Sequence, residues 1–263
     1  MKPSPIRATQ EVASWVPPIA RVGYAAKGLV YLLMGWIAIK AAMASGSPEG
    51  STGALASLVD EPGGQLMLML IAFGLLAHVI WRAVEALLDP EHQGSGAKRV
   101  GVRLFHALSG LIYGSLAWTA WLLSQRGESG SGDGHEVWVS RVLEKPMGTW
   151  LVMLAGIGVA LYGAAQIYKA WQNDVGKRMT GGGPGVQMIG RVGVAARGFV
   201  LVPIGWFVFN AGRYYRAEQA ANTEEVLKML GHGWLLGLVG LGLLAYGVHQ
   251  CAKAIYRRIE RPI

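Results

Sequence analysis

Eight charged or amide side chains interrupt long apolar segments of this sequence. They are Lys27, Arg82, Glu85, Gln166, Lys169, Arg197, Gln250 and Lys253. Ionisable groups inside a membrane are costly and often mark binding or transport sites, so these residues are the first candidates for function. A structural or topogenic role is the favoured interpretation, because long cations reach the headgroups from shallow depths and Arg82 can pair with Glu85. Lipid-headgroup binding and a solute or ion path stay open.

Histidines and the single cysteine are the other reactive residues in the apolar segments. His78 and His249 fall at similar depth, and two facing helical histidines can ligate a b-type haem. Histidines in membrane bundles also hydrogen-bond across helices, so haem is the minor interpretation. Cys251 stands alone, which excludes metal sites built on several thiolates. Without a serine–histidine–acid set, the sequence predicts no catalytic residues, no metal site and no cofactor, and leans away from an enzyme.

Six apolar blocks must position these side chains. They span residues 19–44, 65–88, 100–123, 149–170, 190–211 and 234–255. Each is near the roughly 20 residues that a helix needs to cross a bilayer. Only 15% of the chain is charged, against roughly 25% in an average soluble domain. The sequence therefore predicts an all-α integral membrane protein with six transmembrane helices.

The net charge of +8 is distributed unevenly between the two sides of these blocks. Twelve cations precede the odd blocks or follow the last one: Lys2, Arg7, Arg21, Lys98, Arg99, Arg103, Lys177, Arg178, Arg191, Arg257, Arg258 and Arg261. The opposite loops hold six: Arg126, Arg141, Lys145, Arg213, Arg216 and Lys228. Since cytoplasmic loops carry the excess of Lys and Arg, both termini are predicted to be cytoplasmic. The charge then indicates contact with anionic headgroups and not with nucleic acid.

The blocks form an internal repeat. Residues 21–31 match residues 191–201, and residues 103–113 are a weaker copy in the same register. A tryptophan follows eight residues after the shared glycine in each copy: Trp36, Trp118 and Trp206. The even blocks align at a constant offset of 84 residues, which makes His78, Tyr162 and Tyr246 equivalent. Small residues, among them the pairs Gly110–Gly114 and Gly233–Gly237, predict close helix packing.

Tandem two-helix repeats keep one orientation and are related by rotation about the membrane normal. We therefore predict three parallel repeats in a pseudo-threefold bundle. The predicted segments are a cytoplasmic N-terminal segment (1–18), repeat 1 (19–88), repeat 2 (100–171), repeat 3 (190–256) and a cytoplasmic tail (257–263). Short amphipathic stretches at 54–61, 136–145 and 222–230 are predicted to lie in the outer membrane interface, the first two ending at Pro62 and Pro146.

These motifs resemble a known family. Residues 23–35 (GYAAKGLVYLLMG) are similar to its first-helix signature, and residues 53–64 and 77–86 are similar to its second. The family is the bacterial domain of unknown function 1206, in which three such units occur in tandem. The resemblance covers roughly residues 19–257 and is weakest in repeat 2, where Ser109 replaces Lys or Arg. It implies an inner-membrane location and six helices, and brings no established activity.

Three functions remain open at this point. The leading hypothesis is a non-enzymatic accessory, scaffold or lipid-associated subunit of the bacterial inner membrane. Its predicted partners are anionic lipids on the cytoplasmic side and, in addition, other membrane proteins or copies of itself. A small-solute or ion channel or transporter that uses the inner-leaflet polar layer is the alternative. A haem-binding redox subunit that uses His78 and His249 is the further alternative.

Overall fold

Long helices form most of the protein. The structure, a computed structural model, describes residues 5–43, 47–88, 96–126, 141–145, 147–175, 179, 181, 183–215, 223–230 and 233–257. Six helices there are long and apolar enough to cross a membrane: α1 (Pro5–Met43), α3 (Gly64–Leu88), α4 (Gly96–Arg126), α6 (Gly148–Trp171), α7 (Gly183–Tyr214) and α9 (Trp234–Tyr256). This confirms the predicted fold class, a multi-pass all-α membrane protein.

The predicted spans agree with the helices to within a few residues, except at two N-termini. α1 and α7 begin well before the predicted residues 19 and 190, at Pro5 and Gly183. Apolar composition ends at the membrane surface, whereas a helix can continue into polar surroundings, so hydropathy alone finds the span and not the helix end. The predicted limits of the three repeats and of the two terminal segments stay predictions.

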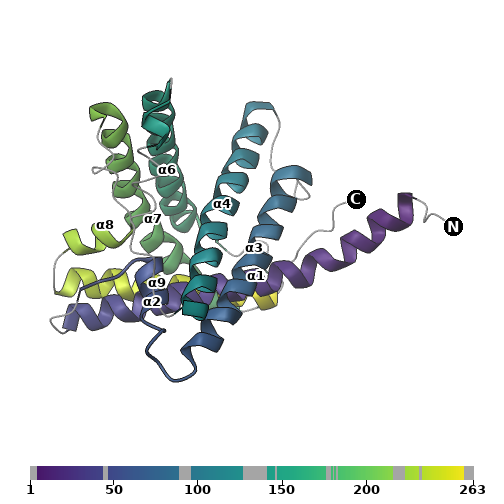
Figure 1. Cartoon of the computed structure of the whole chain (residues 1–263), viewed down its shortest axis with the longest axis horizontal. Helices are drawn as coiled ribbons and strands as arrows, with labels where there is room; N and C mark the ends of the chain where they lie inside the picture. The colour runs from purple at the N-terminus through teal and green to yellow at the C-terminus, as the bar shows by residue number, and fades with distance from the viewer. Residues whose placement is uncertain are drawn as a thin grey trace.

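Each even helix packs on the odd helix of the next repeat. The closest pairs are α6 with α7, α1 with α9, and α3 with α4, while α1 with α3 and α7 with α9 form the next contacts. In Figure 1 the α1/α9 pair lies across the view, and the α3/α4 and α6/α7 pairs rise from it. The last helix thereby pairs with the first, and the three repeats interlock in a ring.

Glycines at equivalent positions allow two of these pairs to approach closely. A Cβ on Gly205 would lie 2.6 Å from the carbonyl oxygen of Gly156, and one on Gly35 2.7 Å from that of Gly240. Each pair has a second glycine contact seven residues, or about two helical turns, along both helices. In the α6/α7 pair it is Gly163 with Gly198, and in the α1/α9 pair it is Gly28 with Gly247. The predicted pairs Gly110–Gly114 and Gly233–Gly237 do not make such contacts. A Cβ added to any of these four glycines would lie 3.4 Å or more from the nearest described atom of another helix.

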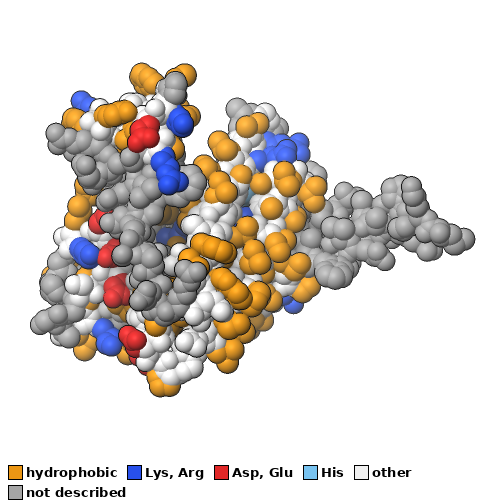
Figure 2. Space-filling view, viewed as in Figure 1, with side chains coloured by type: hydrophobic (Ala, Val, Ile, Leu, Met, Phe, Trp, Pro, Cys, Tyr) orange, Lys and Arg blue, Asp and Glu red, His pale blue; other side chains and the backbone are white. Residues whose placement is uncertain are grey.

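The ring has one open seam, between α4 and α6. In repeats 1 and 3 a glycine lets the two helices of the repeat touch: a Cβ on Gly23 would lie 2.5 Å from the Cα of His78. The equivalent residue of repeat 2 is Phe105, and its ring instead packs on Tyr162 with centroids 4.1 Å apart. α4 and α6 therefore stand apart, and the two arms are separate at the top of Figure 2.

A second set of equivalent residues shows the same opening. Gly74 approaches Ala26 in repeat 1, and Gly242 approaches Ala196 in repeat 3, each so closely that an added Cβ would lie within 2.4 Å of the alanine Cβ. In repeat 2, Gly158 has no neighbour of this kind within 4 Å among the described residues. Exposed leucines line the seam on the faces shared with these positions: Leu104, Leu108 and Leu111 on α4, and Leu154 and Leu161 on α6.

Two short helices cover the end of the bundle opposite to the predicted cytoplasmic side. α2 (Ser51–Ala56) buries Leu55 in the cluster formed by α1, α3 and α4, and α8 (Thr223–Met229) buries Leu227 against α1 and α9. Protein covers the apolar stripes of these helices, so the stripes do not face lipid. The predicted position of the stretches at the outer membrane interface stays a prediction. α2 ends at Ala56, six residues before the predicted end at Pro62, and turns follow at residues 57–60. Residues 136–140, Pro146 and Asn222, which were included in these predictions, lie outside the described part.

The outer faces of the spans are apolar. Trp36, Trp118 and Trp206 are between 58% and 63% exposed, nearly the same value in each repeat. Equal exposure at equivalent positions indicates that each tryptophan faces the lipid in the same way, with its ring on the outside of the bundle. The repeat thus fixes not only the helices but also their outward faces.

Candidate functional site

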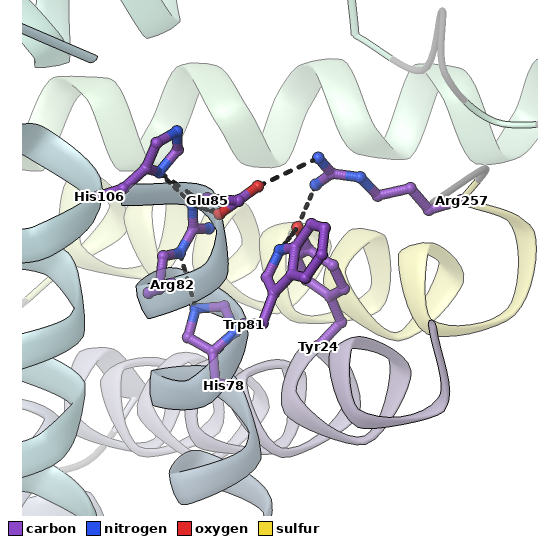
Figure 3. Close-up of polar contacts among 7 residues, drawn as sticks. All are labelled: Tyr24, His78, Trp81, Arg82, Glu85, His106 and Arg257. Carbon is purple, nitrogen blue, oxygen red and sulfur yellow. Dashed lines mark hydrogen bonds and ion pairs between the residues drawn. The ribbon is translucent and has the colours of Figure 1, made fainter. Parts of the chain in front are cut away.

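Glu85 is the centre of a buried polar network. Its carboxylate lies 2.6 Å from Nη1 of Arg82 one turn earlier on α3, 3.4 Å from Nδ1 of His106 on α4, and 3.6 Å from Nη2 of Arg257 after α9. The side chain of Glu85 is only 3% exposed, so solvent screens these charges little. Figure 3 shows the carboxylate between Arg82, His106 and Arg257. We call these four residues the Glu85 network.

The Glu85 network is tied to α1 through Tyr24. The Tyr24 hydroxyl accepts hydrogen bonds from Nε1 of Trp81, at 3.0 Å, and from Arg257 (Figure 3). Tyr24 and Trp81 are almost completely buried, and the guanidinium of Arg257 lies over the Tyr24 ring, 4.9 Å from its centroid. Residues from α1, α3, α4 and the end of α9 therefore meet at this point.

A second group lies deeper in the bundle, around Lys27 and Arg197. The ammonium of Lys27 lies 4.4 Å from the ring centroid of Tyr113, and Nε of Arg197 donates a hydrogen bond of 3.0 Å to the hydroxyl of Tyr31. Both cations also face Tyr246, at 5.9 and 5.2 Å from its centroid. We call these five residues the cation–tyrosine centre.

The four other predicted residues lie in different environments. Lys253 lies 5.8 Å from the Tyr24 ring, between the two groups. Gln250 is buried and donates a hydrogen bond to the Tyr246 hydroxyl, while Gln166 is buried with no partner for its amide nitrogen among the described residues. Lys169, the repeat equivalent of Glu85 and Lys253, is exposed on α6 and does not join either group.

The two haem candidates occupy separate sites. His78 lies between the rings of Tyr24 and Tyr113, and its Nε2 accepts a hydrogen bond from Arg82. His249 is buried against Gly190 of α7, close enough that a Cβ there would lie 2.4 Å from Nδ1. In the described part of the chain these contacts do not include the other histidine. The haem hypothesis stays a prediction.

Buried and half-buried cations outnumber acids in this region. Lys27 is buried, and four further cations are half-buried: Arg82, Arg197, Lys253 and Arg257. The acid that acts on Lys27, Arg82 and Lys253 among the described residues is Glu85. Arg197 has a buried Nη1 without a hydrogen-bond partner in the described residues. Cation–π contacts with tyrosines stabilise such charges only in part. Chemically, the arrangement is suited to holding an anion.

The entry arginines of α4 and α7 bind the end of the preceding helix. Arg103 donates hydrogen bonds to the carbonyl oxygens of Ala86 and Leu87 at the end of α3, and Arg191 donates to that of Ala170 at the end of α6. These helix ends leave carbonyl groups without intrahelical partners, and a cation there also complements the helix dipole. These arginines, at equivalent positions of two repeats, therefore also hold neighbouring helices together, in addition to the role in membrane orientation predicted for them.

Glu49, at the other end of the bundle, is the acid with a perturbed pKa outside the spans. Partial burial and, next, the nearby Glu224 carboxylate raise the pKa of Glu49, while Lys228 opposes the shift. Lys228 is paired with Glu224 at 2.7 Å, which leaves Glu49 less favourably placed. This position connects the loop before α2 with α8.

The sequence did not single out several members of these groups. Arg257 was counted only among the cations of the cytoplasmic side, His106 was given no role, and the tyrosines of the cation–tyrosine centre were not identified as cation partners. A signal was present for the tyrosines: Tyr31 and Tyr113 are equivalent in the odd helices, as are His78, Tyr162 and Tyr246 in the even ones. Aromatic residues recurring beside recurring cations are typical of cation–π contacts.

Comparison with known proteins recovers the same threefold organisation. The family described as Domain of Unknown Function (DUF1206) matches three successive segments, residues 22–89, 105–173 and 192–257. A relative from Bacillus subtilis (strain 168), "Uncharacterized protein YxxB", is 31% identical over 260 residues, covering 95% of this chain and 94% of the relative. No solved structure matches the chain. The resemblance stated from the motifs is confirmed, and the chain belongs to the DUF1206 family of membrane proteins.

Proposed function

We propose that this chain is a non-enzymatic, lipid-associated subunit of the bacterial inner membrane, with both termini in the cytoplasm. The excess of Lys and Arg before the odd helices supports this orientation. Reporter fusions test it: a fluorescent protein at either end is expected to fluoresce, and a periplasmic phosphatase at either end to be inactive. An active phosphatase at either terminus contradicts the orientation.

The observation that supports a lipid-associated role is the excess of buried and half-buried cations beside an open seam. Arg82 and Arg257 pair with the carboxylate of Glu85, whereas Lys27 and Arg197 pair with no carboxylate in the described part of the chain. Tyr162 connects Arg197 with the seam between α4 and α6. Buried charge is costly unless an opposite charge neutralises it. The anionic headgroups of the cytoplasmic leaflet are the abundant anions at a membrane surface. A lipid whose acyl chains lie along the leucines of the seam satisfies both the charge and the apolar face.

Purification in mild detergent followed by native mass spectrometry tests this role. Phosphatidylglycerol is expected to remain bound and to raise the melting temperature, whereas phosphatidylcholine has little effect. At a lipid concentration about 100 times Kd the gain is about 2.7 kcal/mol. Equal responses to the two lipids contradict the proposal. A protein that co-purifies in place of lipid favours the accessory or scaffold form of the same hypothesis.

An anion path is the second candidate, favoured by the depth of the two central cations. Lys27 and Arg197 each lie six residues past the entry arginine of their helix, about 9 Å deeper at 1.5 Å per residue. Intramembrane cations at such depth also line anion pathways. Flux of a permeant anion into liposomes, lost in the Lys27→Ala/Arg197→Ala double variant, supports this candidate. Absence of flux under an imposed gradient rejects it.

A further inference from the structure

We propose that Lys27, Arg197 and Lys253 form a binding site for a phosphate group, entered through the seam between α4 and α6. The inference rests on the proposed lipid-associated role and names its ligand and its residues. The site lies between α1, α7 and α9, where repeats 1 and 3 meet. Repeat 2, whose equivalent residues are Ser109 and the exposed Lys169, supplies the entrance instead of a cation.

The two central cations converge on one aromatic ring. Lys27 and Arg197 come from equivalent positions of α1 and α7, and both lie within 6 Å of the Tyr246 centroid. Lys27 is 4% exposed, and in the described part of the chain no carboxylate pairs with it or with Arg197. The charges that act on Lys27 are Arg197, Arg82 and Lys253, with Glu85 opposing them. Like charges around one ring repel, and an anion beside them reduces the repulsion.

The geometry of the donors favours phosphate over a single-charged, spherical anion. Nε of Arg197 donates to Tyr31, which leaves Nη1 buried and without a hydrogen-bond partner in the described part of the chain. A guanidinium edge matches two oxygens of a phosphate, and the ammonium groups of Lys27 and Lys253 supply point charges for the remaining oxygens. Cation–π contacts hold these groups in place without neutralising them, so the site is organised before the ligand enters.

The seam supplies a route for the ligand. The Tyr162 ring packs against Phe105 at the seam, and its centroid lies 5.6 Å from the guanidinium carbon of Arg197. Leu108 and Leu161, on either side, are 47% and 65% exposed and present an apolar surface for acyl chains. A phosphate group of a lipid can therefore reach Arg197 while its chains stay in the bilayer. Free inorganic phosphate has the same headgroup chemistry without the chains.

Two neutral variants and a matched control test the site. Lys27→Gln and Arg197→Gln each remove one cation, and Lys169→Gln removes an exposed cation at the repeat position of Lys253. Phosphatidic acid, inorganic phosphate and oleate are titrated separately while thermal unfolding is followed. Phosphatidic acid is expected to stabilise the natural protein, each site variant to bind it at least tenfold more weakly, and the control to bind within twofold of the natural protein.

The behaviour without ligand gives an independent readout. Because Lys27 is repelled by its neighbours, Lys27→Gln is expected to raise the melting temperature when no anion is present. If Lys27 only stabilised the fold, Lys27→Gln would instead lower the melting temperature. Arg197→Lys, which keeps the charge and loses the planar fork, covers the case in which Arg197→Gln does not fold. It is expected to bind phosphate more weakly than the natural protein.

The outcomes separate the site from the wider proposal. Retention of anionic lipid by both neutral variants overturns the site but leaves the lipid-associated role intact. Binding of inorganic phosphate alone, lost in the variants, supports the site and overturns the lipid-associated role. Equal binding of oleate and phosphatidic acid overturns the assignment to phosphate. No response to any of the three overturns both.

Discussion

At the scale of single residues, Glu85 has the largest expected effect on stability. Its carboxylate is the anion that Arg82, His106 and Arg257 share, and removing one partner of a buried pair costs about 3–5 kcal/mol because the other charge stays buried. Glu85→Gln keeps the shape and removes the charge. We expect unfolding of purified Glu85→Gln, in denaturant or on heating, to show a loss of this size.

Lys169→Gln is the control for Glu85→Gln, since Lys169 is the repeat equivalent on α6 and is exposed. Its free energy of unfolding is expected to change by less than about 0.5 kcal/mol. A Glu85→Gln protein as stable as the control would show that the carboxylate does not stabilise the bundle.

Glu49 is expected to make the protein more stable as the pH falls, whereas an acid paired with a cation makes it less stable. Burial and Glu224 raise the pKa of Glu49 above its unfolded value of 4.5, so the folded protein disfavours the carboxylate. At a pH above the pKa of Glu49 in both the folded and the unfolded protein, its charged carboxylate lowers the free energy of unfolding. As the pH falls through the raised pKa the folded state takes up the proton first, and stability rises until about pH 4.5.

Thermal unfolding of Glu49→Gln against pH checks this sign. The variant is expected to be slightly more stable than the natural protein at pH 7, with the difference disappearing at pH 4.5. The effect is small because Glu49 is partly exposed to solvent, which screens it. A lower stability of the variant at pH 7 would contradict the assignment.

At the scale of helices, two glycines of α6 allow the effect of close helix packing to be distinguished from the effect of helix propensity. A Cβ at Gly156 would lie 2.4 Å from the backbone nitrogen of Phe209, whereas Gly158, two residues later, has no such neighbour. Gly156→Ala is expected to destabilise by about 1–3 kcal/mol through overpacking. Gly158→Ala is expected to be neutral or to stabilise by up to about 1 kcal/mol, because alanine favours helix. Unfolding free energies of the two variants test the α6/α7 contact; equal values would show that these helices are not closely packed.

The seam between α4 and α6 depends on Phe105. Glycines at the equivalent positions, Gly23 and Gly193, let the helices of repeats 1 and 3 touch. Phe105→Gly is therefore expected to bring Leu108 and Gly158 together, as Ala26 and Gly74 are. To measure this, cysteines replace residues 108 and 158 and Cys251→Ser removes the natural thiol. The two cysteines are expected to cross-link when residue 105 is glycine and not when it is phenylalanine.

Phe105→Leu, which keeps a bulky side chain, is the control and is expected not to cross-link. Cross-linking with phenylalanine, glycine and leucine alike would show that α4 and α6 lie together whatever residue 105 is.

The sequence predicted the helices well but not their pairing. Apolar blocks of about 20 residues identify spans because the bilayer demands that length, and the 84-residue offset identifies equivalent residues. Pairing depends on which small residues face each other, and hydropathy treats Gly28 and Gly110 alike. The spacing of seven between Gly28 and Gly35, repeated in Gly198 and Gly205, was the available signal.

The candidate site was predicted in part for the same reason. Lys27 and Arg197 were identified as recurring polar residues, and the structure brings both against Tyr246. Lys169 was grouped with them by repeat position, yet α6 turns it outward because repeat 2 is displaced at the seam. Arg257 lies just beyond the last span, so its return to Glu85 depends on tertiary structure that periodicity does not contain.

At the scale of the whole molecule, the three repeats are not independent units. Each even helix finds its principal partner in the following repeat, and α9 finds its partner in α1. The cation–tyrosine centre draws on α1, α4, α7 and α9, so no single repeat contains it. Duplication therefore supplied equivalent positions, while divergence of Phe105 and Ser109 in repeat 2 made one side of the ring different from the others.

The pairing of α1 with α9 also sets an order of events during biogenesis. α1 enters the bilayer before α9, so the face of Gly28 and Gly35 and the cation Lys27 are then still uncovered by their later partners. That face meets α9 only when this later span has been synthesised and inserted. During that interval α1 lies beside the insertion machinery or lipid, and its pairing with α9 completes the contact between repeats 1 and 3.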